Sequence, residues 1–338
     1  MIQKYTYGTP FETDAIVTSI PTSEGTPAYG TISTENGFSF TYDMDDNDVV
    51  YGLGESNRGI NKRGYVYESN CSDQPNHTED KISLYGAHNF LVISGKQTFG
   101  LFVDYPGKLK FDIGYTLSSQ LKITCEDADL YLYVIEGETP YDIVKQFRGI
   151  IGRSYIAPKF AFGYGQSRWG YKTEDDFRTV VKKYRENHVP LDMVYMDIDY
   201  MQDYKDFTVN EERFPDFEGF VQDMKKEKIH LVPIIDAGVK VEEGYDIYEE
   251  GCEKGYFCRR EDGSYFEATV WPGWTHFPDV LNADARKWFG DKYDVLVSKG
   301  IDAFWNDMNE PSIFYSQEGL ADFKETAKKY VEGDPEVP

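Results

Sequence analysis

Residues 193–199 (MVYMDID) form an apolar run that ends in two aspartates. Further short apolar runs lie at residues 160–166, 231–236 and 301–306, and polar or aromatic residues follow each of them. Helical patterns separate the runs, at residues 174–187 behind Thr173, near 216–227, at 242–254, and at 282–298 behind Asn282. Strands that alternate with helices predict a parallel sheet, in which chemistry gathers at the carboxyl ends of the strands.

The number of strand–helix units limits this prediction. A closed (β/α)8 barrel needs eight such units and typically about 250 residues. Here four units extend to about residue 311, and the remaining residues hold at most one helix, at 320–331. The sequence therefore predicts either a small open sheet or the first half of a (β/α)8 TIM-type barrel in a fragment of a longer protein.

The part of the chain before this region has a different pattern. Asn36-Gly37 separates residues 31–33 from residues 38–42, which is typical of a two-residue β-hairpin. Further short strands are expected at residues 90–93, 99–103, 109–113, 121–124 and 130–135. Short strands at this spacing predict an antiparallel β-sandwich.

A helix at residues 140–151 is expected to link the two parts. Thr139 can cap it, Pro140 suits its first turn, and Gly152 ends it. The apolar face is expected to contain Ile143, Val144, Phe147, Ile150 and Ile151. We therefore predict an N-terminal β-sandwich domain at 1–152, which includes the helix, and a barrel domain at 153–338.

The composition limits the classes of partner. The 338 residues carry a formal net charge of −24, which repels nucleic acid and anionic lipid. Aromatic residues are abundant, with 27 Tyr, 22 Phe and 5 Trp, and aromatic rings stack on flat, neutral faces such as those of sugars. A neutral ligand or a cation is the expected partner, with no nucleic acid and no membrane surface.

Cysteine and histidine usage gives no sign of a cofactor or metal. The four cysteines form no disulfide framework, Cys252 and Cys258 lie six residues apart, and the five histidines show no metal-ligand spacing. The first residues contain no apolar segment typical of a secretion signal, and no apolar run is long enough to span a bilayer. We expect a cytoplasmic protein without cofactor or metal.

Residues 303–311 (AFWNDMNEP) contain the strongest chemical motif. The predicted strand carries Asp307 to its carboxyl end, and Trp305, two residues earlier, shares its face. Hydrolysis of a glycosidic bond requires two carboxyl groups around an oxocarbenium-like transition state. Asp307 is the candidate for the carboxyl group that attacks the sugar.

At this point the chain resembles the α-glucosidases of glycoside hydrolase family 31. Residues 305–310 match the nucleophile motif of that family, Trp-x-Asp-Met-Asn-Glu. Other blocks of the family are matched in the same order at residues 51–55, 162–171, 190–201, 234–236, 271–273 and 277–279. This resemblance covers roughly residues 50–315.

The resemblance implies roles for individual residues. Asp307 would form a covalent glycosyl-enzyme, and Asp197 would bind sugar hydroxyls. The residues expected to shape the pocket are Ile198, Trp271, Trp305 and Met308 at its walls, Trp169 at its rim, and Asp73 on a loop of the sandwich. Each also has a purely structural interpretation: a strand-end carboxylate for Asp197, core packing for Ile198, Met308 and the tryptophans, and a solvated loop acid for Asp73.

The family's general acid/base has no counterpart in this chain, because it lies in the second half of the barrel. We therefore expect a retaining exo-acting α-glucosidase, acting on terminal glucose of maltose- or isomaltose-like oligosaccharides, that is inactive as residues 1–338 alone. If activity were found, Glu310 or Asp199 would be the candidate acids.

Three alternatives stay open: another activity of the family, such as an α-xylosidase or a glucan lyase; a non-catalytic carbohydrate-binding fragment; and a structural fragment that aggregates. The linkage preference and the oligomeric state are not predicted.

Overall fold

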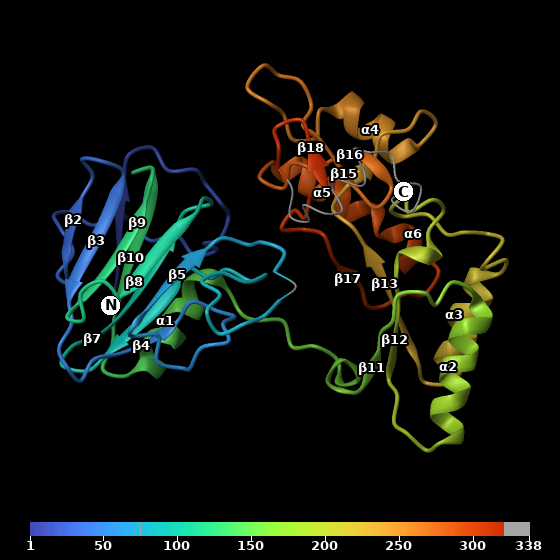
Figure 1. The fold of residues 1–338 in the computed structure, drawn as a ribbon, viewed down its shortest axis with the longest axis horizontal. Helices are drawn as coiled ribbons and strands as arrows, with labels where there is room; N and C mark the ends of the chain where they lie inside the picture. The colour runs from blue at the N-terminus through green and yellow to red at the C-terminus, as the bar shows by residue number, and fades with distance from the viewer. Residues whose placement is uncertain (75, 321–338) are drawn as a thin grey trace. The chain divides into compact units, whose positions relative to one another are not determined.

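The computed structural model describes residues 1–74 and 76–320 and divides into two compact units, Met1–Tyr155 and Ile156–Pro338. The ribbon of both units is drawn in Figure 1. This division falls three residues beyond the boundary that the sequence predicts.

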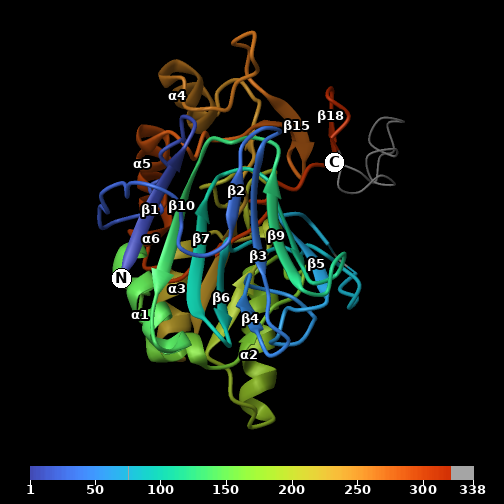
Figure 2. The same ribbon diagram turned by 90° about the vertical axis from the view of Figure 1, so that its left-hand side faces the viewer.

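The first unit is a β-sandwich of two five-stranded antiparallel sheets, seen in Figure 2. One sheet has the order β1-β10-β7-β6-β4 and the other β2-β3-β9-β8-β5. The strands are β1 (Ile2–Tyr7), β2 (Thr31–Ser33), β3 (Phe38–Asp43), β4 (Val49–Gly52), β5 (Tyr65–Ser69), β6 (Phe90–Ser94), β7 (Thr98–Asp104), β8 (Leu109–Ile113), β9 (Gln120–Cys125) and β10 (Leu130–Glu136).

Alternating burial shows how these strands make a core. In β3 and β8 every second residue is buried, so one face of their sheet packs inward. Phe40 and Phe111 from that sheet share a hydrophobic cluster with Leu101 and Leu132 from the other. The sandwich and its five predicted strands after residue 90 are confirmed.

Strand β10 is buried on both faces, because helix α1 (Pro140–Ile151) covers the face that points away from the sandwich core. The helix has the predicted bounds, and Thr139 and Asp142 form the reciprocal cap. Ile143 and Ile150 are buried as expected. Val144 is 41% exposed, so the prediction that it belongs to the buried face was wrong. Val144 follows Ile143 by one position, about 100° around the helix, and therefore points away from the sheet.

The hairpin at Asn36-Gly37 forms, but its loop is longer than predicted. Thr31 pairs with Thr41 and Ser33 with Ser39, which leaves residues 34–37 between the two strands. Gly37 has φ +77°, and a Cβ there would meet the carbonyl oxygens of Cys125 and Glu126 at 2.4 Å. The close approach of residues 125–126 therefore fixes the conformation of this turn as much as Asn36 and Gly37 do.

The second unit contains a parallel sheet of order β11-β12-β13-β17, which is a half-barrel. Its strands are β11 (Gly165–Gln166), β12 (Met193–Met196), β13 (His230–Ile235) and β17 (Trp305–Asn306). The helices are α2 (Glu174–Glu186), α3 (Phe217–Lys226), α4 (Asp246–Lys254), α5 (Ala283–Lys292) and α6 (Asp294–Val297), with 3-10 turns η1 (Lys159–Phe162) and η2 (Ile198–Tyr200).

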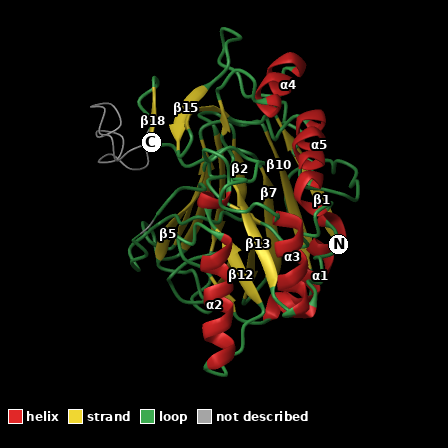
Figure 3. Cartoon of the chain, turned by 90° about the vertical axis from the view of Figure 1, so that its right-hand side faces the viewer, coloured by secondary structure: helices red, strands yellow, loops and turns green. Residues whose placement is uncertain are grey.

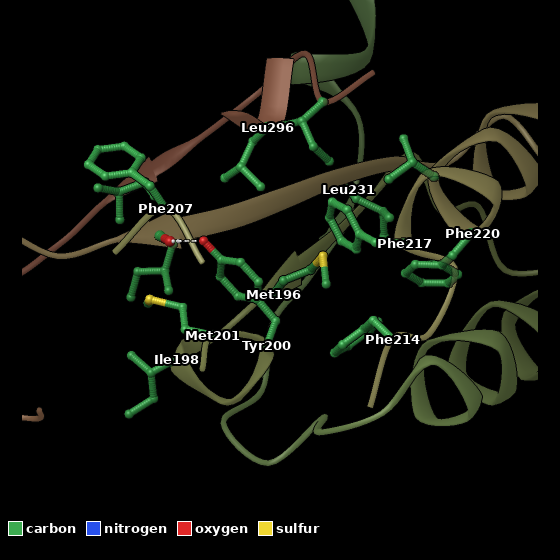
Figure 4. Packing of buried hydrophobic residues seen from close by; sticks show 14 of the residues in the cluster. Met196, Ile198, Tyr200, Met201, Phe207, Phe214, Phe217, Phe220, Leu231 and Leu296 are labelled. Carbon is green, nitrogen blue, oxygen red and sulfur yellow. Dashed lines mark hydrogen bonds between the residues drawn. The ribbon is translucent and has the colours of Figure 1, made fainter. Parts of the chain in front are cut away.

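Helices α2 and α3 lie beside β12 and β13 (Figure 3), and their apolar faces close the core on that side. Phe177 from α2 and Phe220 from α3 pack together with a ring-centroid distance of 6.0 Å. Figure 4 shows Phe220 with Met196 and Leu231 of the strands in the same cluster. Four parallel strands, with helices in the three connections between them, confirm the predicted fold class.

Several predicted elements are shorter in the structure. Residues 160–166 form strand only at the last two positions, because Phe160 belongs to the turn η1 and stacks on His230 at 3.5 Å. Residues 301–306 likewise form strand only at Trp305–Asn306. The helix expected from 242 begins at Asp246, and the helix expected at 282–298 is divided at Tyr293. The helix expected at 320–331 lies outside the described residues.

One sheet of the second unit was not predicted from the sequence. The strands β14 (Val239–Lys240), β15 (Glu267–Val270), β16 (Gly273–His276) and β18 (Tyr315–Ser316) form an antiparallel sheet of order β14-β16-β15-β18. Outside this sheet, the turn at Asp262-Gly263 brings Arg259 and Tyr265 together in an isolated antiparallel bridge. Residue Trp271 follows β15 directly, at the tip of the β15–β16 hairpin.

Candidate active site

Three aspartates follow three neighbouring strands of the half-barrel. Asp197 comes directly after β12, Asp236 after β13 and Asp307 after β17. Because Ile235 pairs with Asn306, Asp236 and Asp307 occupy neighbouring positions one residue further along. The backbone N–H of Asp307 donates to the carbonyl of Ile235 at 3.1 Å, so the ladder continues to the aspartate itself. The structure thus brings Asp197 and Asp307 to the same edge of one sheet.

Asp307 is partly buried, and its Oδ1 accepts a hydrogen bond from the backbone N–H of Met308 at 2.9 Å. It is not enclosed in the hydrophobic core, because it contributes to the lining of a pocket of about 260 Å³. The other contributors to this lining include Asp236, Asn309, Cys258, Phe277 and Tyr293. Asp307 therefore borders an open pocket, but none of the other predicted site residues contributes to the lining of that pocket.

Asp197 is also partly buried, and it caps the turn η2 by accepting from the N–H of Ile198 at 2.8 Å. Burial raises its pKa above the ordinary value, and the nearby negative charges of Asp307 and Asp199 raise it further, while the hydrogen bond from Ile198 acts the other way. The carboxyl groups of Asp197 and Asp307 therefore lie close enough for the charge of Asp307 to affect the ionisation of Asp197.

Ile198 and Met308 are buried in the structure. Ile198 belongs to the main cluster of the second unit, next to Tyr200 and Met201 in Figure 4. Met308 packs with Phe277 and Phe314, and its φ of 57° places it in the left-handed region. Both residues follow a strand-end aspartate directly, so the packing of these side chains fixes the loops that present Asp197 and Asp307.

The tryptophans divide into two groups. Trp169 is 62% exposed, and its ring centroid lies 6.0 Å from that of Trp271. Trp271 contacts the ring edge of Phe314, with centroids 4.9 Å apart. Trp305 is partly buried and meets Tyr195 of β12 at 6.1 Å in an edge-to-face arrangement. Trp169 and Trp271 are thus brought together, and Trp305 shares the Asp307 side of β17, as the two-residue period of a strand requires.

Asp73 belongs to the first unit, where its carboxylate accepts a hydrogen bond from the Tyr85 hydroxyl at 2.6 Å. Its role as a pocket residue stays a prediction.

The two carboxyl groups considered as internal acids differ in the structure. Asp199 is 1% exposed and forms ion pairs with Arg213 at 3.5 Å and Lys172 at 3.7 Å. These ion pairs engage Oδ1 only, and Oδ2 of Asp199 has no hydrogen-bond donor among the described residues. Glu310 is partly buried in the loop between Asp307 and Pro311.

Asp236 was not among the predicted site residues, although its position after an apolar strand could have indicated it. Burial, followed by the charges of Asp307 and Asp197, raises its pKa to about 8. Asp206, in the loop after η2, is fully buried and accepts a hydrogen bond from the N–H of Asp236 at 2.9 Å. No local sequence pattern distinguishes Asp206 from other loop aspartates, so only the tertiary structure finds it.

The parts of the chain that the structure describes contain no group of three or more His, Cys, Asp or Glu side chains that could hold a metal ion. Among these residues there is also no helix that combines the length and hydrophobicity needed to cross a bilayer.

Known proteins resemble both units. Residues 154–334 match the glycosyl hydrolases family 31 TIM-barrel domain, and residues 14–112 match the glycosyl hydrolase 31 N-terminal galactose mutarotase-like domain. Alpha-glucosidase 2 of Bacillus thermoamyloliquefaciens is 37% identical over 290 residues, which is 83% of this chain and 37% of that protein. An alpha-glucosidase of Saccharolobus solfataricus is 29% identical over 272 residues, which is 80% of this chain and 39% of that protein.

Solved structures agree with the fold. The catalytic subunit in the ER glucosidase II heterodimeric complex has a TM-score of 0.74 at 26% identity, over 84% of this chain and 34% of that one. A mutant family 31 dextranase of Flavobacterium johnsoniae, complexed with isomaltotriose, has a TM-score of 0.77 at 21% identity, over 90% of this chain and 40% of that one. This chain therefore spans roughly two fifths or less of the length of each of these four relatives. Because the TIM-barrel model matches more than half of its residues, the chain belongs to glycoside hydrolase family 31.

Proposed function

We propose that this chain provides the nucleophile side of a retaining, exo-acting α-glucosidase, with Asp307 as the nucleophile. The observation that carries this proposal is the position of Asp307 directly after β17, partly buried beside a pocket and at the same sheet edge as Asp197. The names of the relatives support an α-linked glucose as the sugar.

In this reaction the carboxylate of Asp307 attacks the anomeric carbon as the bond to the leaving oxygen breaks. The leaving oxygen takes the bonding electron pair and a proton from a general acid. Water then attacks the glycosyl-enzyme and releases the sugar with its original configuration. Asp197 accepts hydrogen bonds from hydroxyls of the same sugar, while Trp169 and Trp271 cover its apolar faces.

Among the described residues, none is assigned as the general acid in this proposal. Asp199, one of the two internal candidates, is engaged in ion pairs with Arg213 and Lys172. Loss of general acid catalysis costs about two to four orders of magnitude in rate. We therefore propose that residues 1–338 alone release glucose from maltose or isomaltose far more slowly than complete enzymes of the family.

A covalent reagent tests the nucleophile separately from the acid. In a 5-fluoro-α-glucosyl fluoride, fluoride leaves without much help from an acid, so labelling depends mainly on the attacking carboxylate. Incubation should give one adduct, and peptide mapping should place it at Asp307. The Asp307→Asn variant is the matched control and should remain unlabelled. An adduct on another residue would overturn the assignment.

Substrate assays separate the alternatives. Faster cleavage of an aryl α-xyloside than of the aryl α-glucoside would favour an α-xylosidase, and formation of an unsaturated sugar would indicate a lyase. Binding of maltose or isomaltose without labelling would favour a non-catalytic carbohydrate-binding protein. Glucose release at the rate of an ordinary enzyme would show that an acid is present within the chain, with Glu310 the first residue to replace.

The net charge of −24 is compatible with a small neutral oligosaccharide as the partner. A cytoplasmic location stays a prediction.

A further inference from the structure

Two buried carboxyl groups lie directly behind the strand ends of the half-barrel. Asp206 is 0% exposed and Asp236 is 2% exposed. Oδ1 of Asp206 accepts from the N–H of Asp236 at 2.9 Å. Among the described residues, none donates a hydrogen bond to Oδ2 of Asp206 or to either carboxyl oxygen of Asp236.

The hydroxyl groups of the three tyrosines near this pair donate hydrogen bonds to other acceptors. Tyr200 donates to the carbonyl of Ile234 at 2.8 Å, an interaction drawn as a dashed line in Figure 4. Tyr245 donates to the backbone carbonyl of Asp206 at 2.8 Å. Tyr293 donates to the side-chain oxygen of Asn306 at 2.6 Å. These tyrosines therefore fix the backbone and a neighbouring side chain, and leave the two carboxyl groups without a donor.

The charges that act on the pair are all negative. Burial, followed by the charges of Asp307 and Asp197, raises the pKa of Asp236. Burial above all, with the proximity of the Asp236 carboxyl group, raises the pKa of Asp206 well above its ordinary value. Ionised carboxylates that are buried without donors or cations are strongly disfavoured, so these groups hold their protons. Asp199 differs in its neighbours: it is equally buried and its Oδ2 also lacks a donor among the described residues, but Arg213 and Lys172 lie beside it.

The pair is also connected to Asp307 through the backbone. Asp206 holds the N–H of Asp236, and the preceding residue, Ile235, accepts from the N–H of Asp307 at 3.1 Å. A displacement of the β13 end would therefore displace the N–H of Asp307. A second negative charge at Asp236 would also disfavour the ionised form of Asp307.

We propose that Asp206 and Asp236 form a neutral acid pair that positions Asp307 and keeps it as the charged carboxylate at this edge of the sheet. Neither member of the pair attacks the sugar; both are positioning residues. The role assigned to Asp307 rests on the proposed function, whereas the protonation of the pair does not.

The test is a pH titration of the chain labelled with ¹³C at aspartate carboxyl carbons. The resonances of Asp206, Asp236 and Asp307 are assigned by their loss in the corresponding Asp→Asn variants. The resonance of Asp236 should titrate near pH 8. The resonance of Asp307 should show a step at the same pH, and this step should vanish in Asp236→Asn. Titration of Asp236 together with exposed aspartates, or the absence of the step at Asp307, would overturn the proposal.

Infrared spectroscopy gives a second measurement that requires no variant to fold. Protonated carboxyl groups absorb separately from carboxylates, and the unaltered chain should retain this absorption at neutral pH. Where the variants fold, Asp236→Asn should remove the part of the absorption that disappears near pH 8, and Asp199→Asn should leave it unchanged. If no protonated carboxyl group is found at neutral pH, the proposal is wrong.

Covalent labelling separates this proposal from the proposed function. Asp236→Asn should be labelled by the 5-fluoro-α-glucosyl fluoride at close to the parent rate near neutral pH, because the amide keeps the shape and the neutral charge. Asp236→Ala should be labelled at least tenfold more slowly. A chain that shows the titration but is never labelled would refute Asp307 as the nucleophile and leave the neutral acid pair established.

Discussion

The buried carboxyl groups of the two units differ in the number of hydrogen-bond donors that contact them. In the sandwich, Asp48 accepts hydrogen bonds from the Tyr42 hydroxyl at 3.2 Å and from the backbone N–H groups of Asp45 and Lys96 at 2.9 Å and 3.1 Å. In the half-barrel, Asp206 and Asp236 are buried to the same degree, yet three of their four carboxyl oxygens have no donor among the described residues.

This difference separates structural from functional acids. A buried carboxylate with enough donors stabilises the loop around it, as Asp48 does between β3 and β4. A buried acid without donors is a cost to folding, and such costs concentrate at functional sites, where perturbed pKa values are useful. The half-barrel therefore carries its unsatisfied acids at the sheet edge that presents Asp307.

The largest expected effect concerns Asp307 itself. Asp307→Asn should slow covalent labelling by about 10³-fold or more, because the amide is a poor nucleophile. The measurement is the labelling rate followed by intact-mass spectrometry. Thermal unfolding of the same variant is the control and should be little changed. Labelling at the parent rate would assign the chemistry to another residue.

The acid pair should give the reverse of ordinary acid unfolding. Because burial raises the folded-state pKa of Asp236 to about 8, its proton favours the folded state, and this stabilisation is lost as the pH rises through that value. The parent should lose up to about 1.4 kcal/mol of stability per pH unit as the pH rises from about 5 to about 8, and little more above pH 8. Asp236→Asn cannot ionise and should show a flatter profile in denaturant titrations between pH 6 and pH 9. Parallel profiles for parent and variant would contradict this.

Removal of the satisfied acid of the sandwich should destabilise the first unit. Asp48→Ala leaves the Tyr42 hydroxyl and two backbone N–H groups without their acceptor, and it should cost about 3 kcal/mol. Urea denaturation followed by a probe in the sandwich measures the change. Asp46→Ala, at an exposed position in the same turn, is the control and should change stability by less than about 0.5 kcal/mol. Equal losses of stability in Asp48→Ala and Asp46→Ala would show that the hydrogen bonds to Asp48 do not stabilise the sandwich, which would contradict the difference between the two units.

Asp199 tests the same contrast inside the half-barrel. Asp199→Asn removes the charge that pairs with Arg213 and Lys172, both of which are partly exposed, and it should cost about 2 kcal/mol. At neutral pH, Asp236→Asn should cost clearly less, because it replaces a neutral group with another. The reverse order of stability would show that Asp236 is ionised.

The smallest effects should be alike in the two units. Thr139 and Thr173 both cap a helix through the same reciprocal arrangement, with Asp142 and Asp176 as the partners. Thr139→Ala and Thr173→Ala should each cost about 1 kcal/mol, and the Thr→Ser controls should cost little. Helix stability measured by hydrogen exchange in α1 and α2 tests this. A large difference between the two caps would mean that tertiary contacts, rather than local bonds, hold one of these helix ends.

Local patterns predicted the elements whose ends are fixed by their own residues. The bounds of α1 could be predicted because Thr139, Asp142 and Gly152 supply both caps. The strand ends at Asp197 and Asp307 could be predicted because the change from apolar to polar residues is sharp. The lengths of β11 and β17 could not, because a strand exists only where a neighbour pairs with it, and Phe160 instead stacks on His230.

The order of the units and the placement of Asp197 and Asp307 at the ends of parallel strands could be predicted from periodicity and caps within a few residues, and the resemblance of residues 305–310 indicated the family. That Asp206 and Asp236 form a buried pair behind Asp307 could be seen only in the folded chain. The physical reason is that an acid's protonation depends on burial and on charges contributed by other strands, and residues 206, 236 and 307 come together only when the sheet forms.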